Sequence, residues 1–304
     1  MHLNRVSSEI LCSRLSVREY FFFMLTRLLI FLCAISPFLR KKLWRWWYGK
    51  LAREIDAGIW TFMNYGYLPP ESASEKLLSL KPEDEPDRLC IQLYERVVSP
   101  AHLAGASVLE VGSGRGGGSS YFARYHKPTQ VTGMDYSSDA VTFCQERHRS
   151  VPNLQFILGD AEKLPFADAS FDVVVNVESS HCYGNVGKFF DEVARVLRPG
   201  GYFVFADLRG ATEMDQLEEI LAAQSYWEKI EEEDITARVA AALEADDTRK
   251  RKMIAEVVSP RLRPMFEEFA GVEGGKVSLG FQKRDLLYFR FAFRRKGNRS
   301  SDQE

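Results

Sequence analysis

The run Glu110-Val-Gly-Ser-Gly-Arg-Gly116 holds an acid followed by glycines at every second position. It lies between a short apolar segment, 107–111, and a helix-like segment, 118–125. Glycines at such a turn let the backbone approach a ligand closely, and the helix that follows offers free N–H groups. A carboxylate beside the turn would repel a pyrophosphate, whereas it suits a ligand with a cationic amine and a sulfonium. The run therefore favours a site for a positively charged nucleoside, with a purely structural turn as the alternative.

Polar residues also stand at the ends of the apolar segments that follow. Asp135 comes directly after 130–134, about 20 residues past the glycines, where an acid can bind ribose hydroxyls. Asp160 and Ala161 follow 154–158, and Asn176 lies near the end of 171–177. The carboxyl ends of parallel strands share one edge of a sheet, and open α/β sheets bind ligands there. We therefore expect one nucleoside pocket, formed by Glu110, Gly112, Gly114, Gly116, Asp135, Asp160, Ala161 and Asn176.

Strand-like and helix-like segments alternate from residue 107 onward. This alternation predicts an α/β fold in which helices cover both faces of a mostly parallel sheet. The expected strands are 107–111, 130–134, 154–158, 171–177 and 202–206, and helices are expected at 118–125, 138–147 and 186–197. Two further strands, 276–281 and 286–294, are expected to close a seven-stranded sheet as an antiparallel hairpin.

The segment 213–268 is rich in helix-like sequence, includes the charged stretch 228–234, and is longer than a connection requires. Because it follows the fifth strand, at the ligand-binding edge, we expect it to fold over an acceptor pocket as a lid. The alternative is a surface decoration. We expect residues 1–60 to form an N-terminal extension and residues 61–304 to form one α/β domain.

Composition excludes several classes of function. The chain of 304 residues has a formal net charge of −2, which argues against nucleic-acid binding over the whole molecule. Its five cysteines are scattered and form no CxxC pair, which argues against a zinc site or a disulfide framework. Reduced thiols of this kind are typical of the cytosolic side of a membrane.

The N-terminal segment 20–38 is strongly apolar, and Arg27 is its only charge. Its length is close to the roughly 20 residues that span a bilayer. Basic residues and tryptophans follow directly, from Arg40 to Trp47, in a mixture typical of the membrane–water interface. A spanning or re-entrant helix, an interfacial helix and a helix packed on the domain all stay open. We expect membrane association through this helix, with the α/β domain on the cytoplasmic side.

Several motifs together resemble those of class I S-adenosylmethionine-dependent methyltransferases. They are ExGxGxG at 110–116, Asp135, GDAEKLPF at 159–166, FDVVVNVESSHCY at 171–183 and LRPGGYF at 197–203. Within that class the chain is similar to the mycobacterial phthiotriol/phenolphthiotriol dimycocerosates methyltransferases, from about residue 44 to residue 293 and most strongly over 108–209. The apolar segment 20–38 departs from the mycobacterial pattern, so the particular lipid stays open.

The resemblance implies a Rossmann-like fold, S-adenosyl-L-methionine as the cofactor, and a long lipid acceptor that is methylated at a hydroxyl oxygen. It also implies that Gly112, Gly114 and Gly116 pack against the methionine and ribose parts of the cofactor. Glu110 would support this loop or bind the amine of the cofactor.

For the remaining motif residues the resemblance implies three roles. Asp135 would bind the ribose hydroxyls, Asp160 and Ala161 would flank the adenine, and Asn176 and Glu178 would border the place of methyl transfer. Methylation at carbon or nitrogen of a sterol, a quinone or a lipid amine is the alternative reaction. A membrane-tethered scaffold that binds the cofactor without turnover is the alternative class of protein.

An acceptor hydroxyl must lose its proton when it is methylated, so a general base is expected. His181, four residues after the fourth strand, is the candidate because imidazole titrates near neutral pH. Glu178 could orient His181 or serve as the base itself. The alternative is that His181 only packs in its loop and binds backbone.

Overall fold

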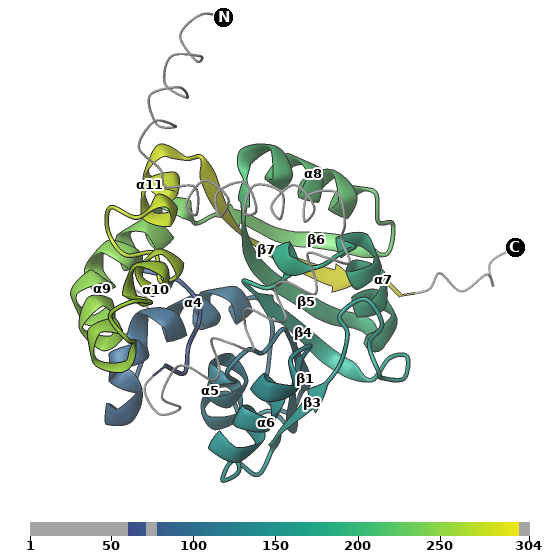
Figure 1. Ribbon diagram of the computed structural model, residues 1–304. Coiled ribbons are helices and arrows are strands. Elements are labelled where there is room, and N and C mark those ends of the chain that lie inside the picture. The colour runs from purple at the N-terminus through teal and green to yellow at the C-terminus, as the bar shows by residue number, and fades with distance from the viewer. Residues whose placement is uncertain (1–59, 71–77, 298–304) are drawn as a thin grey trace, which may run out of the picture.

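The computed structural model describes residues 60–70 and 78–297, which form one sheet in the order β3-β2-β1-β4-β5-β7-β6 (Figure 1). Neighbouring strands are parallel except at β7, which is antiparallel to both β5 and β6. The expected fold class, a mostly parallel α/β sheet with antiparallel C-terminal strands, is confirmed. The strands are β1 (Ser107–Val111), β2 (Gln130–Asp135), β3 (Leu154–Leu158), β4 (Phe171–Val177), β5 (Leu197–Gly210), β6 (Trp227–Asp234) and β7 (Leu286–Arg295).

The central strands are apolar on both faces because helices cover both sides of the sheet. In β1, Val108 packs into the core on one face and Leu109 into the core on the other, and Val173 and Val174 of β4 divide in the same way. The first core includes α4 (Arg88–Val98), α5 (Gly117–Tyr125), α9 (Thr236–Val257) and α11 (Lys276–Lys283). The second includes α7 (Val186–Val196) and α8 (Ala211–Ala222), while α6 (Ser138–Arg147) packs on β3.

The segment 276–281, expected as a strand, belongs to helix α11, so the expectation for this segment is wrong. Val277, Leu279 and Phe281 alternate with polar or small residues, which is the pattern of a strand. In the helix, Val277 and Phe281 lie one turn apart and both pack into the core, whereas Leu279 is 37% exposed. So short a run satisfies both periodicities, and the contacts of the folded chain decide between them.

The charged stretch 228–234, expected within a helix-rich segment, belongs to strand β6. Among the described residues this strand is the edge of the sheet and pairs only with β7, and residues 228–232 are all exposed. Charged side chains suit an exposed edge because they discourage pairing with another chain. The helices of 213–268 are therefore two groups: α8 precedes β6, and α9 and α10 (Arg263–Phe269) follow it. Figure 1 shows α9, α10 and α11 gathered beside α4 at one end of the molecule.

The apolar segment 20–38 and the tryptophans that follow it lie outside the residues that the structure describes. Within residues 60–70 and 78–297, no helix has both the length and the apolar character that crossing a bilayer requires. We therefore correct the expected localisation, which placed the protein at a membrane with its catalytic domain on the cytoplasmic side, because no described element supports it.

Candidate active site

The loop after β1 needs glycine at three positions. Gly112, Gly114 and Gly116 have φ angles of 76°, 54° and 79°, in the left-handed region that other residues rarely enter. A Cβ atom at Gly114 would have a single described neighbour within 4 Å, Met63 Sδ at 3.6 Å. The backbone at Gly114 therefore has room on the side where Met63 stands.

Asp135, at the end of β2, holds the same loop in place. Its Oδ2 accepts a hydrogen bond from the backbone N of Gly114 at 2.8 Å, and its Oδ1 accepts one from the backbone N of Ser137 at 2.9 Å. Burial raises the pKa of Asp135, while these N–H groups act in the opposite direction. A carboxylate can accept more than two hydrogen bonds, so Asp135 keeps capacity for ligand hydroxyls.

Glu110 is fully buried behind the loop. Its Oε1 accepts a hydrogen bond from the Tyr94 hydroxyl at 2.8 Å, and its Oε2 accepts one from the Ser119 hydroxyl. Burial raises the pKa of Glu110 to about 7. These hydrogen bonds connect β1 to α4 and α5. Such a position suits a residue that supports the loop.

Asn176 is fully buried near the end of β4. Its Nδ2 donates to the Val111 carbonyl at 2.8 Å and to the Tyr183 hydroxyl at 2.9 Å. Its Oδ1 has no hydrogen-bond partner among the described residues. A buried hydrogen-bond acceptor without a partner is rare in folded proteins, so a ligand group that donates a hydrogen bond fits this position.

Asp160 and Ala161 follow β3, which lies next to β2 in the sheet. Leu158 pairs with Asp135 across the two strands, so the strand ends are side by side. The Oδ1 atom of Asp160 accepts a hydrogen bond from the backbone N of Glu162 at 2.9 Å, and Ala161 is buried. The structure thus brings these two residues to the same edge of the sheet as Asp135.

The short turn η2 (Ser180–Cys182), which carries His181, packs directly on the glycine loop. Ser179 Oγ and Tyr183 Oη flank the turn and lie 2.8 Å apart. A Cβ atom at Gly112 would lie 2.0 Å from Ser179 Oγ and 3.2 Å from Tyr183 Oη. Glycine at position 112 is therefore what allows the turn to lie against the loop.

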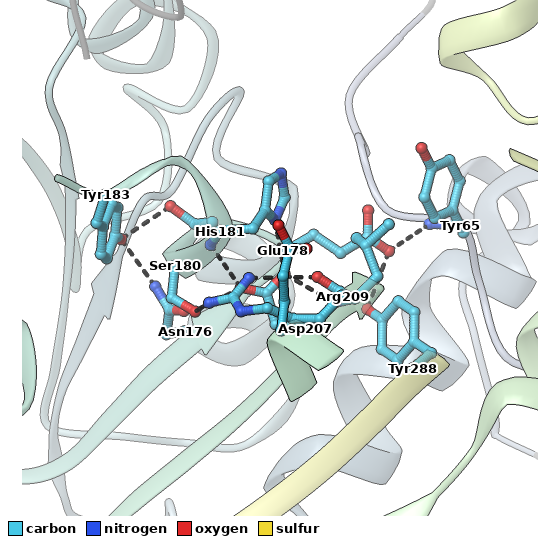
Figure 2. Close-up of polar contacts among 12 residues, drawn as sticks. Tyr65, Asn176, Glu178, Ser180, His181, Tyr183, Asp207, Arg209 and Tyr288 are labelled. Carbon is cyan, nitrogen blue, oxygen red and sulfur yellow. Dashed lines mark hydrogen bonds and ion pairs between the residues drawn. The ribbon is translucent and has the colours of Figure 1, made fainter. Parts of the chain in front are cut away.

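His181 is held by Asp207, near the carboxyl end of β5 (Figure 2). Nδ1 of His181 lies 2.6 Å from Oδ1 of Asp207, and the backbone N of His181 donates to Oδ2 at 2.9 Å. Asp207 is fully buried, and its Oδ2 also accepts from the Ser180 hydroxyl and pairs with Arg209 at 3.4 Å. With the Nδ1 proton directed at this carboxylate, Nε2 is the nitrogen that takes up a proton.

Burial disfavours the charged form of both partners, yet their mutual attraction outweighs it. The pKa of His181 lies well above its ordinary value, despite burial, because Cys182 and Asp207 favour the imidazolium. The pKa of Asp207 is lowered, despite burial, by His181 and Arg209. The mutual attraction of the pair therefore favours the imidazolium form of His181, which becomes a base as the pH rises through its raised pKa.

Glu178 is held by two tyrosines. Its Oε1 accepts hydrogen bonds from the backbone N of Tyr65 at 2.8 Å and from the Tyr288 hydroxyl at 2.9 Å (Figure 2). Burial raises the pKa of Glu178 to about 7, and its φ of 48° is strained for a residue other than glycine. Glu178 thus joins residues 60–70 to β7, and the contact that orients His181 is made by Asp207.

The sequence analysis did not single out Asp207, Tyr65 or Tyr288. Asp207 directly follows the expected strand 202–206, just as Asp135 directly follows the expected strand 130–134. The rule that an acid at a strand end marks the site could therefore have found Asp207. Tyr65 and Tyr288 reach Glu178 from 113 and 110 residues away along the chain. No local pattern connects residues at such separations.

Comparisons with known proteins find relatives in sequence and in fold. A family model described as a methyltransferase domain matches residues 109–205. The phthiotriol/phenolphthiotriol dimycocerosates methyltransferase of Mycobacterium tuberculosis is 40% identical over 253 residues, which cover 83% of this chain and 92% of that protein. A fatty-acid O-methyltransferase of Mycolicibacterium smegmatis is 39% identical over 68% of this chain and 74% of that protein.

A solved structure shows the same fold. Geranyl diphosphate C-methyltransferase from Streptomyces coelicolor, in complex with Mg²⁺, geranyl diphosphate and S-adenosyl-L-homocysteine, gives a TM-score of 0.57. The match covers 83% of this chain and 97% of that chain, at 16% sequence identity. At this identity the likeness concerns the fold alone.

Proposed function

Because this chain belongs to the phthiotriol/phenolphthiotriol dimycocerosates methyltransferase family, we propose that it methylates a hydroxyl oxygen of a lipid-like acceptor. The chain is an S-adenosylmethionine-dependent methyltransferase. Its curated relatives are named for dimycocerosates and for fatty acids, both of which are lipids. The choice of a hydroxyl rests on one observation, the His181–Asp207 pair beside the glycine loop, because an alcohol needs a base when it is methylated.

The residues at the sheet edge fit the cofactor. When bound, S-adenosylmethionine supplies an electrophilic methyl group on a sulfonium. Asp135 has acceptor capacity for ribose hydroxyls, and the unpaired Oδ1 of Asn176 suits an ammonium group. The room beside Gly114 lets a ligand approach the loop. We assign the cofactor to the pocket formed by Glu110, Gly112, Gly114, Gly116, Asp135, Asp160, Ala161 and Asn176.

His181 acts as the general base in this proposal, and Asp207 is its positioning residue. Nε2 of His181 takes the hydroxyl proton as the acceptor oxygen becomes methylated. Asp207 holds the ring by Nδ1 and stabilises the imidazolium that results. The imidazolium then returns its proton to solvent, which restores the enzyme.

In this proposal, residues 60–70 and helices α9 and α10 cover the active site. Glu178 fastens this segment through Tyr65, and the Trp60 ring packs against Phe266 and Phe269 of α10, with centroids 6.2 and 6.3 Å away. A covered site excludes water and admits an apolar acceptor. We propose that α9 and α10, within the segment 213–268, form the lid.

The test is the release of S-adenosylhomocysteine from S-adenosylmethionine in the presence of a hydroxylated lipid. The matched acceptor is the same lipid with its hydroxyl already methylated. We expect release with the first acceptor and none above background with the second. Equal release with both acceptors would exclude the hydroxyl as the position of methylation.

A further inference from the structure

A cavity lies between residues 60–65, helix α4 and helices α9 and α10. Trp60, Met63, Tyr65, Met253 and Phe269 contribute its apolar and aromatic side chains. The room left among the side chains is about 20 Å³, enough for a water molecule. A larger ligand therefore enters only by displacing side chains that line the cavity.

Residues 60–65 form a wall that the cavity shares with the reactive part of the molecule. On one side, Met63 Sδ lies 3.6 Å from the Cβ position of Gly114, in the loop assigned to the cofactor. Farther along, the backbone N of Tyr65 donates to Glu178 at 2.8 Å. A ligand that fills the cavity would therefore lie against Met63 and Tyr65, of which the first stands beside the cofactor loop and the second binds Glu178.

The charged groups of the cavity are already paired with protein atoms. Arg249 pairs with Asp87 at 3.3 Å and with Asp246 at 2.6 Å. Lys250 Nζ donates to the Ala270 carbonyl at 3.2 Å, and burial lowers the pKa of Lys250. Arg249 is thus neutralised by two carboxylates and Lys250 already has a carbonyl acceptor, which leaves the apolar side of the cavity for packing against a ligand.

We propose that this cavity receives the hydrocarbon chain of the acceptor and that Met253 determines how long a chain it takes. The inference rests on the proposed function, because it assigns the chain of the lipid whose hydroxyl is methylated. Methionine side chains are unbranched and flexible, so Met63 and Met253 can be displaced at low cost. Each methylene that enters the cavity should strengthen binding roughly fourfold, the equivalent of ~0.8 kcal/mol per buried methylene.

The experiment titrates a homologous series of straight-chain primary alcohols into the full chain by calorimetry, without a methyl donor. In the wild type, affinity should rise with each added methylene and then level off at the length that fills the cavity. Met253→Trp occupies the cavity, so affinity should level off at a shorter chain while the shortest alcohols still bind. Met253→Ala should move the limit to a longer chain.

Met265→Trp is the matched control, because Met265 packs on the same hydrophobic cluster from α10 but does not line the cavity. Its chain-length limit should equal that of the wild type. Equal limits in all variants, or a shift with Met265→Trp as large as that with Met253→Trp, would overturn the proposal. Turnover is measured separately. A wild type that binds the series but methylates no alcohol would reject the proposed function. The shifts in the chain-length limit would still show whether the cavity receives the hydrocarbon chain.

Discussion

Nδ1 of His181 lies 2.6 Å from Oδ1 of Asp207, although the two residues are 26 positions apart; His181 follows the end of β4 in the turn η2, and Asp207 lies near the end of β5. The parallel pairing of β4 with β5 brings these ends together, with Val177 opposite Ala206. A base on one strand end is therefore oriented by an acid on the next. The predictions below follow from this pair and from the glycine loop on which it packs.

The substitution Asp207→Asn should reduce turnover roughly 10²–10⁴-fold, the range for the loss of general-base catalysis. The amide cannot stabilise the imidazolium that forms when the acceptor loses its proton. Cofactor affinity should stay near that of the wild type, because the Asp207 carboxylate binds Ser180, His181, Leu208 and Arg209 and not the glycine loop. Steady-state kinetics and calorimetric titration with S-adenosylmethionine measure the two effects, and Asp168→Asn, at a highly exposed site, is the control.

The value of kcat/KM should rise with increasing pH and then level off. Below its raised pKa His181 is an imidazolium and cannot take a proton, and above it the neutral ring can. Asp207→Asn removes a charge that raises this pKa, so the residual activity of that variant should level off at a lower pH. A wild-type profile that falls over the same range would show that the imidazolium is the active form, as expected for a carboxylate acceptor, which brings no proton.

The substitution Gly112→Ala should lower both stability and turnover. Its Cβ would lie 2.0 Å from Ser179 Oγ, so the turn that carries His181 must move. Gly105→Ala is the control, because Gly105 has a similar φ of 74° and nothing within 4 Å of its Cβ position. The control should lose about 1–2 kcal/mol through its left-handed φ alone and keep full activity. Denaturant unfolding and turnover measure both, and equal losses in the two variants would contradict the contact with Ser179.

The substitution Asp135→Ala should weaken the binding of S-adenosylmethionine by roughly 1.5–3 kcal/mol, which is the usual contribution of hydrogen bonds to a charged group. Part of this loss reflects the loop, because Asp135 also accepts the hydrogen bond from Gly114. Asp191→Ala, on an exposed face of α7, should bind as tightly as the wild type. Calorimetric titration measures both variants, and unchanged affinity in Asp135→Ala would remove this residue from the cofactor site.

Local sequence patterns predicted the part of the molecule in which neighbouring residues cooperate. The glycines at 112, 114 and 116 form the turn that was expected after the first strand, and all three have positive φ angles. The strand ends with Asp135, Asp160 and Asn176 meet at one edge of the sheet because parallel pairing aligns them. Here the positions of the residues depend on short segments whose periodicity is clear, so the sequence alone could predict those positions.

Local patterns failed where distant segments decide the outcome. The run 276–281 has the alternation of a strand, yet it folds as a helix in which Val277 and Phe281 pack into the core and Leu279 stays exposed. Glu178 was expected to orient His181 or to serve as the base itself, but its hydrogen bonds go to Tyr65 and Tyr288, which lie near opposite ends of the described chain. Such contacts depend on how the sheet and helices assemble, and no short stretch of sequence encodes them.

The most direct measurement follows a labelled methyl group from S-adenosylmethionine into a hydroxylated lipid and identifies its position in the product by NMR. The account predicts a methoxy signal with the wild type and with His102→Ala, which changes an exposed histidine. With His181→Ala, the same product should form roughly 10²–10⁴-fold more slowly. A label on carbon or nitrogen, or a normal rate of methoxy formation in His181→Ala, would contradict it.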